Sequence, residues 1–382
     1  MPNTLVPSIA SFVSLCSWVR RALVAVALSA ILGACAHAPT HNEDDPVLVS
    51  FATVGDSRAE AGAPELSPQD ERWLQNTPTL HRILSGITSQ SPNLLFFNGD
   101  MIMGYTPDPR TMDRQYAFWR GIMARFMEDG TYVVPVPGNH EVQRADFKGA
   151  AKLARPENEA LWRDNMGDLI LDTARFQRVV GAAPTAFDPA NHPAKDDLDH
   201  IASDQTRLSY SFDVRGTHFI IINTDPVGND SHAPVHWLAD DLAAAQARGN
   251  RRFFVFGHKP AYTYKFKGGD AIDGFDANPE NQQAFWDLME RYNAVYFCGH
   301  QHIFHMEQPR LAQGGHAWQV MIGSGGSPFS AKTPTGNPLD RMYAWAQVQV
   351  RRSGRVDITA WGFDDKLGPT RVLQKVVVNL SE

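Results

Sequence analysis

Carboxylate, amide and imidazole side chains follow five short apolar runs of the sequence, in each case next to a glycine. In chain order these segments are Gly55-Asp56-Ser57-Arg58, Gly99-Asp100, Gly138-Asn139-His140-Glu141, Gly257-His258 and Gly299-His300-Gln301-His302. Glycine lets the backbone turn sharply and sit close to a ligand. Because ligands of open α/β sheets bind beyond the carboxyl ends of the strands, we expect the five segments to converge on one crevice. Their mixed imidazole and oxygen ligands favour Zn, Mn or Fe over Ca or an all-oxygen Mg site.

The order of these segments resembles the calcineurin-like metallophosphoesterase superfamily, whose signature runs Gly-Asp, Gly-Asp, Gly-Asn-His-Asp/Glu, Gly-His and Gly-His-x-His. Two further stretches, Tyr210-Ser211-Phe212-Asp213 and Gly323-Ser324-Gly325-Gly326, resemble its purple-acid-phosphatase-like branch. The resemblance covers about residues 48 to 330. It implies an α/β fold, a four-layer αββα sandwich in which helices flank two mixed β-sheets, and an enzyme that hydrolyses a phosphate ester.

The resemblance also implies a dinuclear centre of divalent or trivalent metal ions. Asp100 would bridge the two ions, Asp56 and His302 would complete the first position, and the second would take Asn139, His258 and His300. A carboxylate suits the bridge, because two cations about 3.5 to 4 Å apart need a shared anion. Two divalent ions, two aspartates and a bridging hydroxide leave a surplus of about +1, which attracts a phosphate ester.

The expected nucleophile is that hydroxide, since coordination lowers the pKa of bound water towards ~7. In the family the histidine that matches His140 protonates or polarises the leaving oxygen, and Glu141 is the candidate to orient it. The same core supports phosphodiesters and phosphomonoesters. We expect specificity to come from walls formed by residues 59 to 78, 103 to 115, 143 to 205 and 261 to 279.

One position departs from the family pattern. Many members have a histidine two residues after the first aspartate, where this chain has Arg58, and a guanidinium cannot ligate a cation. Purple acid phosphatases place a tyrosine three residues after the second aspartate; here that residue is Met103, and Tyr105 follows two residues later. Three hypotheses follow: Arg58 forks onto the phosphate oxygens, Tyr105 ligates the first ion, or the first ion is held weakly. Arginine suits bidentate phosphate contact, which favours the first.

A different class of function is a catalytically idle exported protein that keeps the fold in order to bind a metal or a partner in the cell envelope. Retention of His140 and of every expected ligand except at the Arg58 position speaks against it.

Apolar runs of strand length precede the five segments, and amphipathic stretches separate several of them. The runs are Leu48 to Val54, Leu94 to Phe97, Tyr132 to Val136, Phe253 to Phe256 and Ala294 to Cys298. Helices are predicted over Thr111 to Glu128, Val235 to Arg248 and Glu280 to Tyr292. This alternation predicts an α/β fold with buried strands.

Further strands are predicted on both sides of the last helices. They are Leu208 to Val214 and Thr217 to Asn223, which form a hairpin, and then Gln319 to Ile322, Trp345 to Val350, Val356 to Trp361 and Val372 to Val378. Residues 143 to 205 show no clear period and are interpreted as an insertion.

The N-terminus has the pattern of an export signal. Arg20 and Arg21 precede the apolar run Ala22 to Ala34, whose end, Leu32-Gly33-Ala34-Cys35, resembles a bacterial lipobox. We predict a signal peptide over residues 1–34, lipidation of Cys35, a tether over 35–46 and the metallophosphoesterase domain over 47–382. Ala36 after the cysteine favours the periplasmic face of a Gram-negative outer membrane. The alternative is an ordinary signal peptide cleaved near Ala36-His37-Ala38.

The amino-acid composition limits the classes of molecule that we expect the chain to bind. Residues 1–34 carry two arginines and no acidic residue, so removing them changes the net charge from −7 to 33 minus 42, or −9. That excess argues against binding nucleic acid by bulk charge. No apolar run reaches 18 residues, so we expect membrane contact only through the lipid anchor, and the expected ligand is a small-molecule phosphate ester. Acylation of Cys35 would leave Cys298 unpaired in the mature chain, which excludes a disulfide framework.

Overall fold

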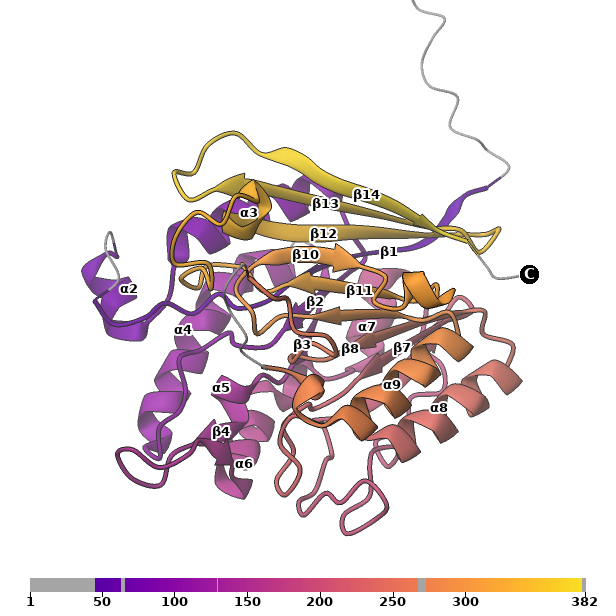
Figure 1. Cartoon of the computed structure of the whole chain (residues 1–382), viewed down its shortest axis with the longest axis horizontal. Coiled ribbons are helices and arrows are strands. Elements are labelled where there is room, and N and C mark those ends of the chain that lie inside the picture. Colours follow the sequence, from indigo (N-terminus) through magenta and orange to yellow (C-terminus); the bar gives the residue numbers. More distant parts are fainter. Residues whose placement is uncertain (1–44, 63–65, 129, 267–272, 380–382) are drawn as a thin grey trace, which may run out of the picture. The chain divides into compact units, whose positions relative to one another are not determined.

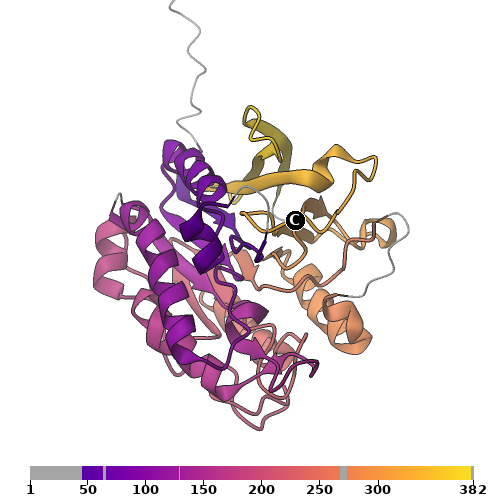
Figure 2. The same ribbon diagram turned by 90° about the vertical axis from the view of Figure 1, so that its left-hand side faces the viewer.

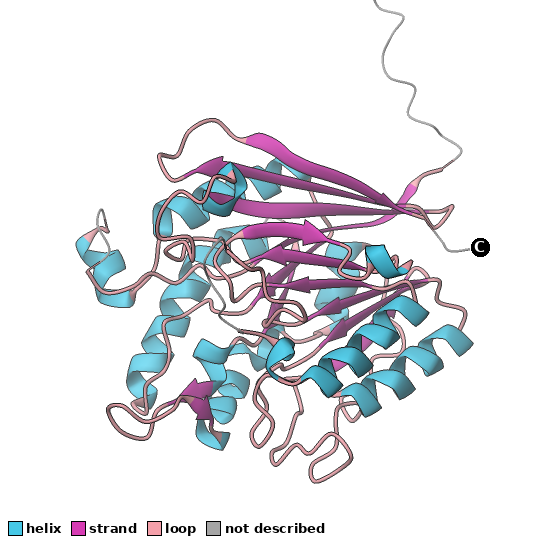
Figure 3. Cartoon of the chain, in the orientation of Figure 1, coloured by secondary structure: helices cyan, strands magenta, loops and turns pink. Residues whose placement is uncertain are grey.

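The structure is a computed structural model that describes residues 45–62, 66–128, 130–266 and 273–379. The predicted signal peptide, Cys35 and the tether up to residue 44 lie outside the described residues. Residues from Val47 onwards form one compact unit, in which two six-stranded sheets face each other and helices cover their outer faces (Figure 3). The predicted architecture of two mixed sheets flanked by helices is therefore confirmed.

The first sheet combines parallel and antiparallel pairs. Its strand order is β14 (Arg371–Val378), β13 (Val356–Asp364), β12 (Met342–Arg351), β1 (Val47–Val54), β2 (Leu94–Asn98) and β3 (Tyr132–Val136) (Figure 1). β1, β2 and β3 run parallel, whereas β12 pairs with β1 in the antiparallel sense and starts the C-terminal meander.

The second sheet is mixed as well. Its order is β10 (Phe304–Glu307), β11 (Trp318–Ile322), β9 (Val295–Cys298), β8 (Arg252–Phe256), β7 (Thr217–Ile221) and β6 (Tyr210–Val214). The pairs from β11 to β7 are parallel, and β10 and β6 close the two edges in the antiparallel sense. The predicted β6–β7 hairpin is confirmed.

Phenylalanine rings fill the space between the sheets. Phe51 of β1 lies edge-on to the rings of Phe219, Phe254, Phe256 and Phe297 of the second sheet, with centroids 5.0–5.8 Å apart. Such edge-to-face contacts add to the free energy gained by burying the apolar rings. The sheets are thus held face to face, with their strand ends in fixed relation.

Helices cover the outside of both sheets. The longer ones are α3 (Thr77–Gln90), α4 (Pro109–Glu128), α8 (Val235–Ala247) and α9 (Pro279–Arg291), and Figure 2 shows α9 on the opposite side of the unit from α3 and α4. Buried side chains of α3 and α4 belong to the core around the first sheet, and those of α8 and α9 pack on Phe253, Val255 and Cys298. Cys298 is buried, as expected of a strand residue.

Shorter elements complete the described chain. They are α2 (Pro68–Trp73), α5 (Asn139–Val142), β4 (Gln143–Arg144), β5 (Leu153–Ala154), α6 (Pro156–Met166), α7 (Thr173–Val180), and the 3₁₀ turns Gly167–Leu169, Phe275–Ala277, Leu311–Gln313 and Pro338–Arg341. None of the helices in the described parts of the chain combines the length and apolar character needed to cross a bilayer.

The segment 143–205, in which the sequence showed no period, contains the helices α6 and α7. In α6 the polar residues Asn158 and Glu159 are buried together with Trp162. Glu159 accepts a hydrogen bond from Gln205 (3.2 Å), so the inward face of α6 is stabilised partly by a polar contact. For this reason the apolar periodicity of the sequence does not predict the helix.

A buried charged network ties the β6–β7 hairpin to α8. His218 of β7 contacts two carboxylates: its Nδ1 lies 2.5 Å from Asp213 Oδ1 and its Nε2 lies 2.8 Å from Asp241 Oδ2. Arg248 adds a contact of 2.8 Å to Asp213 Oδ2. Burial lowers the pKa of His218, but the two carboxylates raise it more, so that its net shift is upward.

We expect His218 to make stability depend on pH. Because its pKa is raised in the folded state, the stabilisation is complete below the unfolded pKa of about 6.5 and is lost as the pH rises through the folded value. The difference in free energy of unfolding between wild type and His218→Gln should therefore be larger at about pH 6 than at about pH 9. Urea unfolding measures it, with exposed His81→Gln as control. A difference that does not change with pH would contradict the assignment.

Candidate metal centre

The five polar segments of the sequence meet at one edge of the two facing sheets. Asp56, Asp100 and His300 follow β1, β2 and β9, and all three adopt left-handed backbone angles, with φ of 59°, 51° and 68°. Such angles are strained for residues other than glycine and cluster at functional sites. A Cβ on Gly138 would lie 2.5 Å from Asp100 Oδ1, and one on Gly299 would lie 2.2 Å from Asp56 Oδ2. Both glycines are needed for this close approach.

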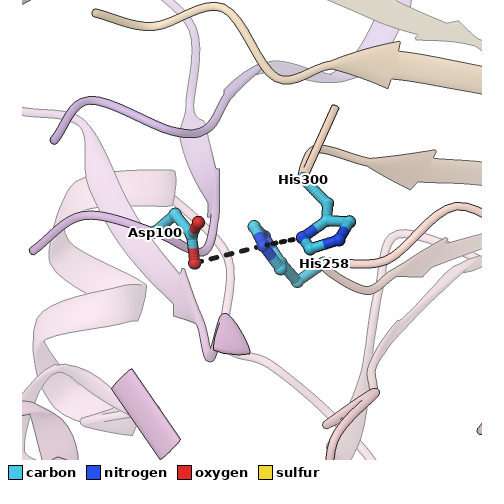
Figure 4. Close-up of side chains that lie close together, drawn as sticks. All are labelled: Asp100, His258 and His300. Atoms are coloured by element: carbon cyan, nitrogen blue, oxygen red, sulfur yellow. Dashed lines mark hydrogen bonds and ion pairs between the residues drawn. The ribbon is translucent and has the colours of Figure 1, made fainter. Parts of the chain in front are cut away.

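The hydrogen bonds of two histidine rings fix which nitrogen is free. His258 Nδ1 lies 2.8 Å from the Asn98 carbonyl oxygen, and His300 Nε2 lies 2.9 Å from Asp273 Oδ1. These nitrogens must carry the protons, because carbonyl and carboxylate oxygens only accept. The lone pairs of His258 Nε2 and His300 Nδ1 consequently point inward, towards Asp100 (Figure 4).

Four acceptor atoms therefore face one another. His258 Nε2 lies 3.1 Å from Asp100 Oδ1 and 3.2 Å from His300 Nδ1, which in turn lies 3.0 Å from Asn139 Oδ1. Burial opposes a charge on His258, but Asp100 and Asp56 raise its pKa to about 10, so the site calls for positive charge. A proton on His258 still leaves His300 Nδ1 opposite Asn139 Oδ1. A cation among the four atoms satisfies them all, and imidazole, carboxylate and amide oxygen suit Zn, Mn or Fe.

A second acidic and imidazole group shares Asp100. The ligand atoms of Asp56, Asp100 and His302 lie within 4.8 Å of one another. His302 Nδ1 lies 2.6 Å from the Pro328 carbonyl oxygen, which leaves Nε2 as the free nitrogen, 3.6 Å from Asp56 Oδ1. Burial, and then the charge of Arg58, lower the pKa of His302 to about 3, so its ring is neutral.

Arg58 points into this second group. Its Nε lies 3.5 Å from Asp100 Oδ2 and its Nη2 lies 3.4 Å from His302 Nε2. The hydroxyl of Tyr105, by contrast, contacts Asn139 Nδ2, on the side of the first group of acceptors. The hypothesis that Tyr105 completes the Asp56–His302 position is therefore not supported by its hydrogen bonding.

His140 lies beside the same Asp100 oxygen as Arg58. Its Nδ1 lies 2.5 Å from the Met103 carbonyl oxygen and its Nε2 lies 3.6 Å from Asp100 Oδ2. Burial lowers the pKa of His140 and outweighs the opposing charge of Asp100. The ring packs on Tyr105 with centroids 3.7 Å apart, and Lys152 Nζ lies 3.6 Å from the centre of the same tyrosine ring.

Glu141 holds the backbone and does not touch the His140 ring in any hydrogen bond of the described structure. Its Oε1 accepts from the N–H groups of Met101 (2.9 Å) and Ile102 (3.1 Å), and its Oε2 from those of Asp100 (2.9 Å) and Gly138 (2.8 Å). The Met103 carbonyl oxygen contacts the His140 ring directly, and Glu141 binds the backbone of the turn that precedes His140, so its orienting role stays a prediction.

Seven of the site residues expected from the sequence line one cavity of about 480 Å³: Arg58, Asp100, Tyr105, Asn139, His140, His300 and His302. Asp56 and His258 do not line it, but their ligand atoms lie close to those of Asp100. Each of the four predicted wall segments lines it through at least one residue: Glu60, Tyr105, Lys152, Tyr264, Phe266 and Asp273. Three further residues belong to the site but to none of the sequence motifs: Asp273, which contacts His300 Nε2, and the cavity residues Lys152 and Lys332. No motif marks them, because they come from segments without a recognisable pattern.

Comparison with known proteins gives a family and a fold. Residues 51–304 match the family profile described as calcineurin-like phosphoesterase. A search of the curated proteins found no match. Among solved structures the chain is similar to a purple acid phosphatase from yellow lupin (Lupinus luteus) seeds, with a TM-score of 0.55, 12% identity, and coverage of 87% of this chain and 53% of the other. It is also similar to a dimetal phosphatase from Danio rerio, with a TM-score of 0.50, 12% identity, and coverage of 88% and 100%.

At this identity the two structures establish the fold alone. The chain spans about half the length of the lupin protein and the whole of the fish protein.

We expect Glu141→Gln to destabilise the site. A glutamine has one oxygen, so its NH₂ group would face two of the four backbone N–H donors, and each unsatisfied buried group costs about 1–3 kcal/mol. Urea unfolding of the metal-free protein should show a loss of at least about 2 kcal/mol. Glu71→Gln, at an exposed position in α2, is the matched control. Equal stability of Glu141→Gln and wild type would contradict this role.

Proposed function

Because the chain belongs to the calcineurin-like phosphoesterase family, a family of phosphoester hydrolases, we propose that it hydrolyses a phosphate ester, monoester or diester, with metal ions held at Asp100. The observation that carries the proposal is the set of inward-facing acceptor atoms on Asp100, Asn139, His258 and His300, next to His140 in one cavity. Acceptor atoms packed at about 3 Å need a proton or a metal cation between them, and one metal ion can serve all four atoms.

The residues fit a metal ion at this group: Asp100, Asn139, His258 and His300 would hold it. The sequence leads us to expect a second ion at Asp56, Asp100 and His302. Mn, Zn and Fe are the metals that suit such ligands. When bound, the metal supplies Lewis acidity, which makes water a nucleophile near neutral pH and polarises the phosphoryl oxygens.

Positive side chains around the cavity would bind the phosphate. Arg58 has its guanidinium beside Asp100 Oδ2, and Lys152 stands at the mouth above the Tyr105 ring. A guanidinium binds two phosphate oxygens at once, whereas an ammonium acts as a point charge. The first of the three hypotheses for Arg58, contact with phosphate, remains compatible with its place in the cavity.

His140 would act on the leaving oxygen. The Met103 carbonyl and the Tyr105 ring hold the imidazole, so that Nε2 faces the cavity side of Asp100. A histidine placed in this way can stabilise or protonate the departing alkoxide, which contributes about 10²- to 10⁴-fold in rate.

The site acts, in this proposal, outside the cytoplasm. The support is the sequence alone: Arg20 and Arg21, the apolar run to Ala34, and the lipobox-like segment that ends at Cys35. Membrane attachment would come from that lipid, on the periplasmic face and at the outer membrane. Mass spectrometry of the N-terminal peptide of wild type and Cys35→Ser tests it; an unacylated N-terminus beyond Cys35 in the wild type would contradict it.

We expect the purified chain to hydrolyse p-nitrophenyl phosphate or bis-p-nitrophenyl phosphate, to lose activity on chelation and to regain it with Mn or Zn. His140→Asn should lower turnover by about 10²- to 10⁴-fold while its metal content stays unchanged. His81→Asn, at an exposed position in α3, is the control that should keep full activity. A wild type that retains metal but hydrolyses neither ester would favour the alternative, an idle metal-binding envelope protein. The ratio of the hydrolysis rates of the two nitrophenyl esters would separate a monoesterase from a diesterase.

A further inference from the structure

The two groups of ligand atoms that share Asp100 differ in one respect: in the Asp56–Asp100–His302 group, the Arg58 guanidinium already contacts the acceptor atoms. We infer that Arg58 supplies the positive charge at the Asp56–Asp100–His302 group, and that the chain firmly binds one metal ion, at Asp100, Asn139, His258 and His300. This single-ion site differs from the two-ion site expected from the sequence. The inference rests on the proposed function only where it concerns catalysis; the number of bound ions does not depend on it.

The lone pair of His302 is the first reason. Its Nδ1 donates to the Pro328 carbonyl oxygen at 2.6 Å, so the only acceptor left on the ring is Nε2. Arg58 Nη2, which only donates, lies 3.4 Å from that nitrogen. One lone pair cannot serve a guanidinium and a metal ion at the same time. At the other group, His300 Nδ1 lies 3.0 Å from Asn139 Oδ1 and 3.2 Å from His258 Nε2, and neither contact is to a guanidinium.

The shared carboxylate is the second reason. Asp100 Oδ1 faces His258 and the first group of acceptors, while Oδ2 is the oxygen available to a second ion. Arg58 Nε lies 3.5 Å from Oδ2. The guanidinium therefore borders two of the three ligand atoms of the second position, and a cation placed between them would be repelled by it.

Arg58 is also held in place. Its backbone N–H donates to the Asp100 carbonyl oxygen (3.4 Å), its carbonyl accepts from Ser327 Oγ (2.9 Å), and a β-bridge joins it to Gln75. The side chain is 8% exposed. Since the backbone is fixed on both sides of the residue, the guanidinium cannot leave the site by a shift of the loop.

The exchange lowers the charge of the site by one but leaves it positive. Before a hydroxide forms, one divalent ion and Arg58, with both aspartates ionised, leave a surplus of about +1, whereas two ions without the arginine leave about +2. The site with one ion therefore still attracts a phosphate ester, and the guanidinium adds directed donors for its oxygens.

Metal content and magnetic coupling test the inference. The full chain is stripped of metal, loaded with Mn²⁺, desalted, and examined by elemental analysis and electron paramagnetic resonance. Wild type should retain about one Mn²⁺ per chain with the spectrum of an isolated ion, and Arg58→His, which adds an imidazole at this position, should retain about two with an exchange-coupled spectrum. Exposed Arg110→His is the matched control and should behave as wild type.

Two firmly bound, coupled ions in the wild type would overturn the inference, as would a single ion in a correctly folded Arg58→His. If Arg58→His does not fold, Arg58→Gln, which removes the charge, should raise the affinity for a second ion, and no change would overturn it. Failure of the proposed function is distinct: no bound metal, or one bound ion without hydrolysis of either nitrophenyl ester. Two ions with hydrolysis would refute only the single-ion inference.

Discussion

The structure around the candidate site depends on one electrostatic constraint: acceptor atoms are forced against each other at Asp100. His258 and His300 turn their lone pairs inward because Asn98 and Asp273 bind their other nitrogens. Taking such groups out of water costs free energy unless a partner of opposite charge is present. The fold meets this need in two ways. At Asp100 Oδ1 it forms a site for a metal ion, and at Asp100 Oδ2 it places the Arg58 guanidinium.

This arrangement needs a rigid support, and the two sheets give it. Aromatic packing around Phe51 fixes the sheets to each other, so the ends of β1, β2, β8 and β9 stay together. At the strand ends the backbone is strained, with Asp56 and Asp100 in left-handed conformations. Glu141 offsets part of that strain, because its carboxylate accepts hydrogen bonds from backbone N–H groups in the turns after β2 and β3.

Arg58 links this geometry to function. In a site with two ions, a guanidinium beside Asp100 and His302 would be a defect, because like charges repel. With one ion it becomes part of the site: it neutralises the shared carboxylate, keeps the net charge attractive for phosphate and presents planar donors to it. His140, whose Nδ1 contacts the Met103 carbonyl oxygen, lies beside the same Asp100 oxygen as Arg58, and its proposed role is on the leaving oxygen.

The sequence by itself determined the strands that precede the five polar segments, the order of those segments and the family, because buried strands and the polar turns after them depend on local patterns. The five runs before Asp56, Asp100, Asn139, His258 and His300 are strands, as predicted. Only the tertiary structure decided which atoms meet. Asp273 contacts His300, and Lys152 contacts the Tyr105 ring, from loops that show no sequence pattern. The buried face of α6 includes the polar residue Glu159, so its sequence lacks the apolar period of a helix. The direction of the Arg58 side chain is likewise decided by the tertiary structure. The sequence shows that an arginine at this position cannot ligate a metal, but its place between Asp100 and His302 follows from long-range packing.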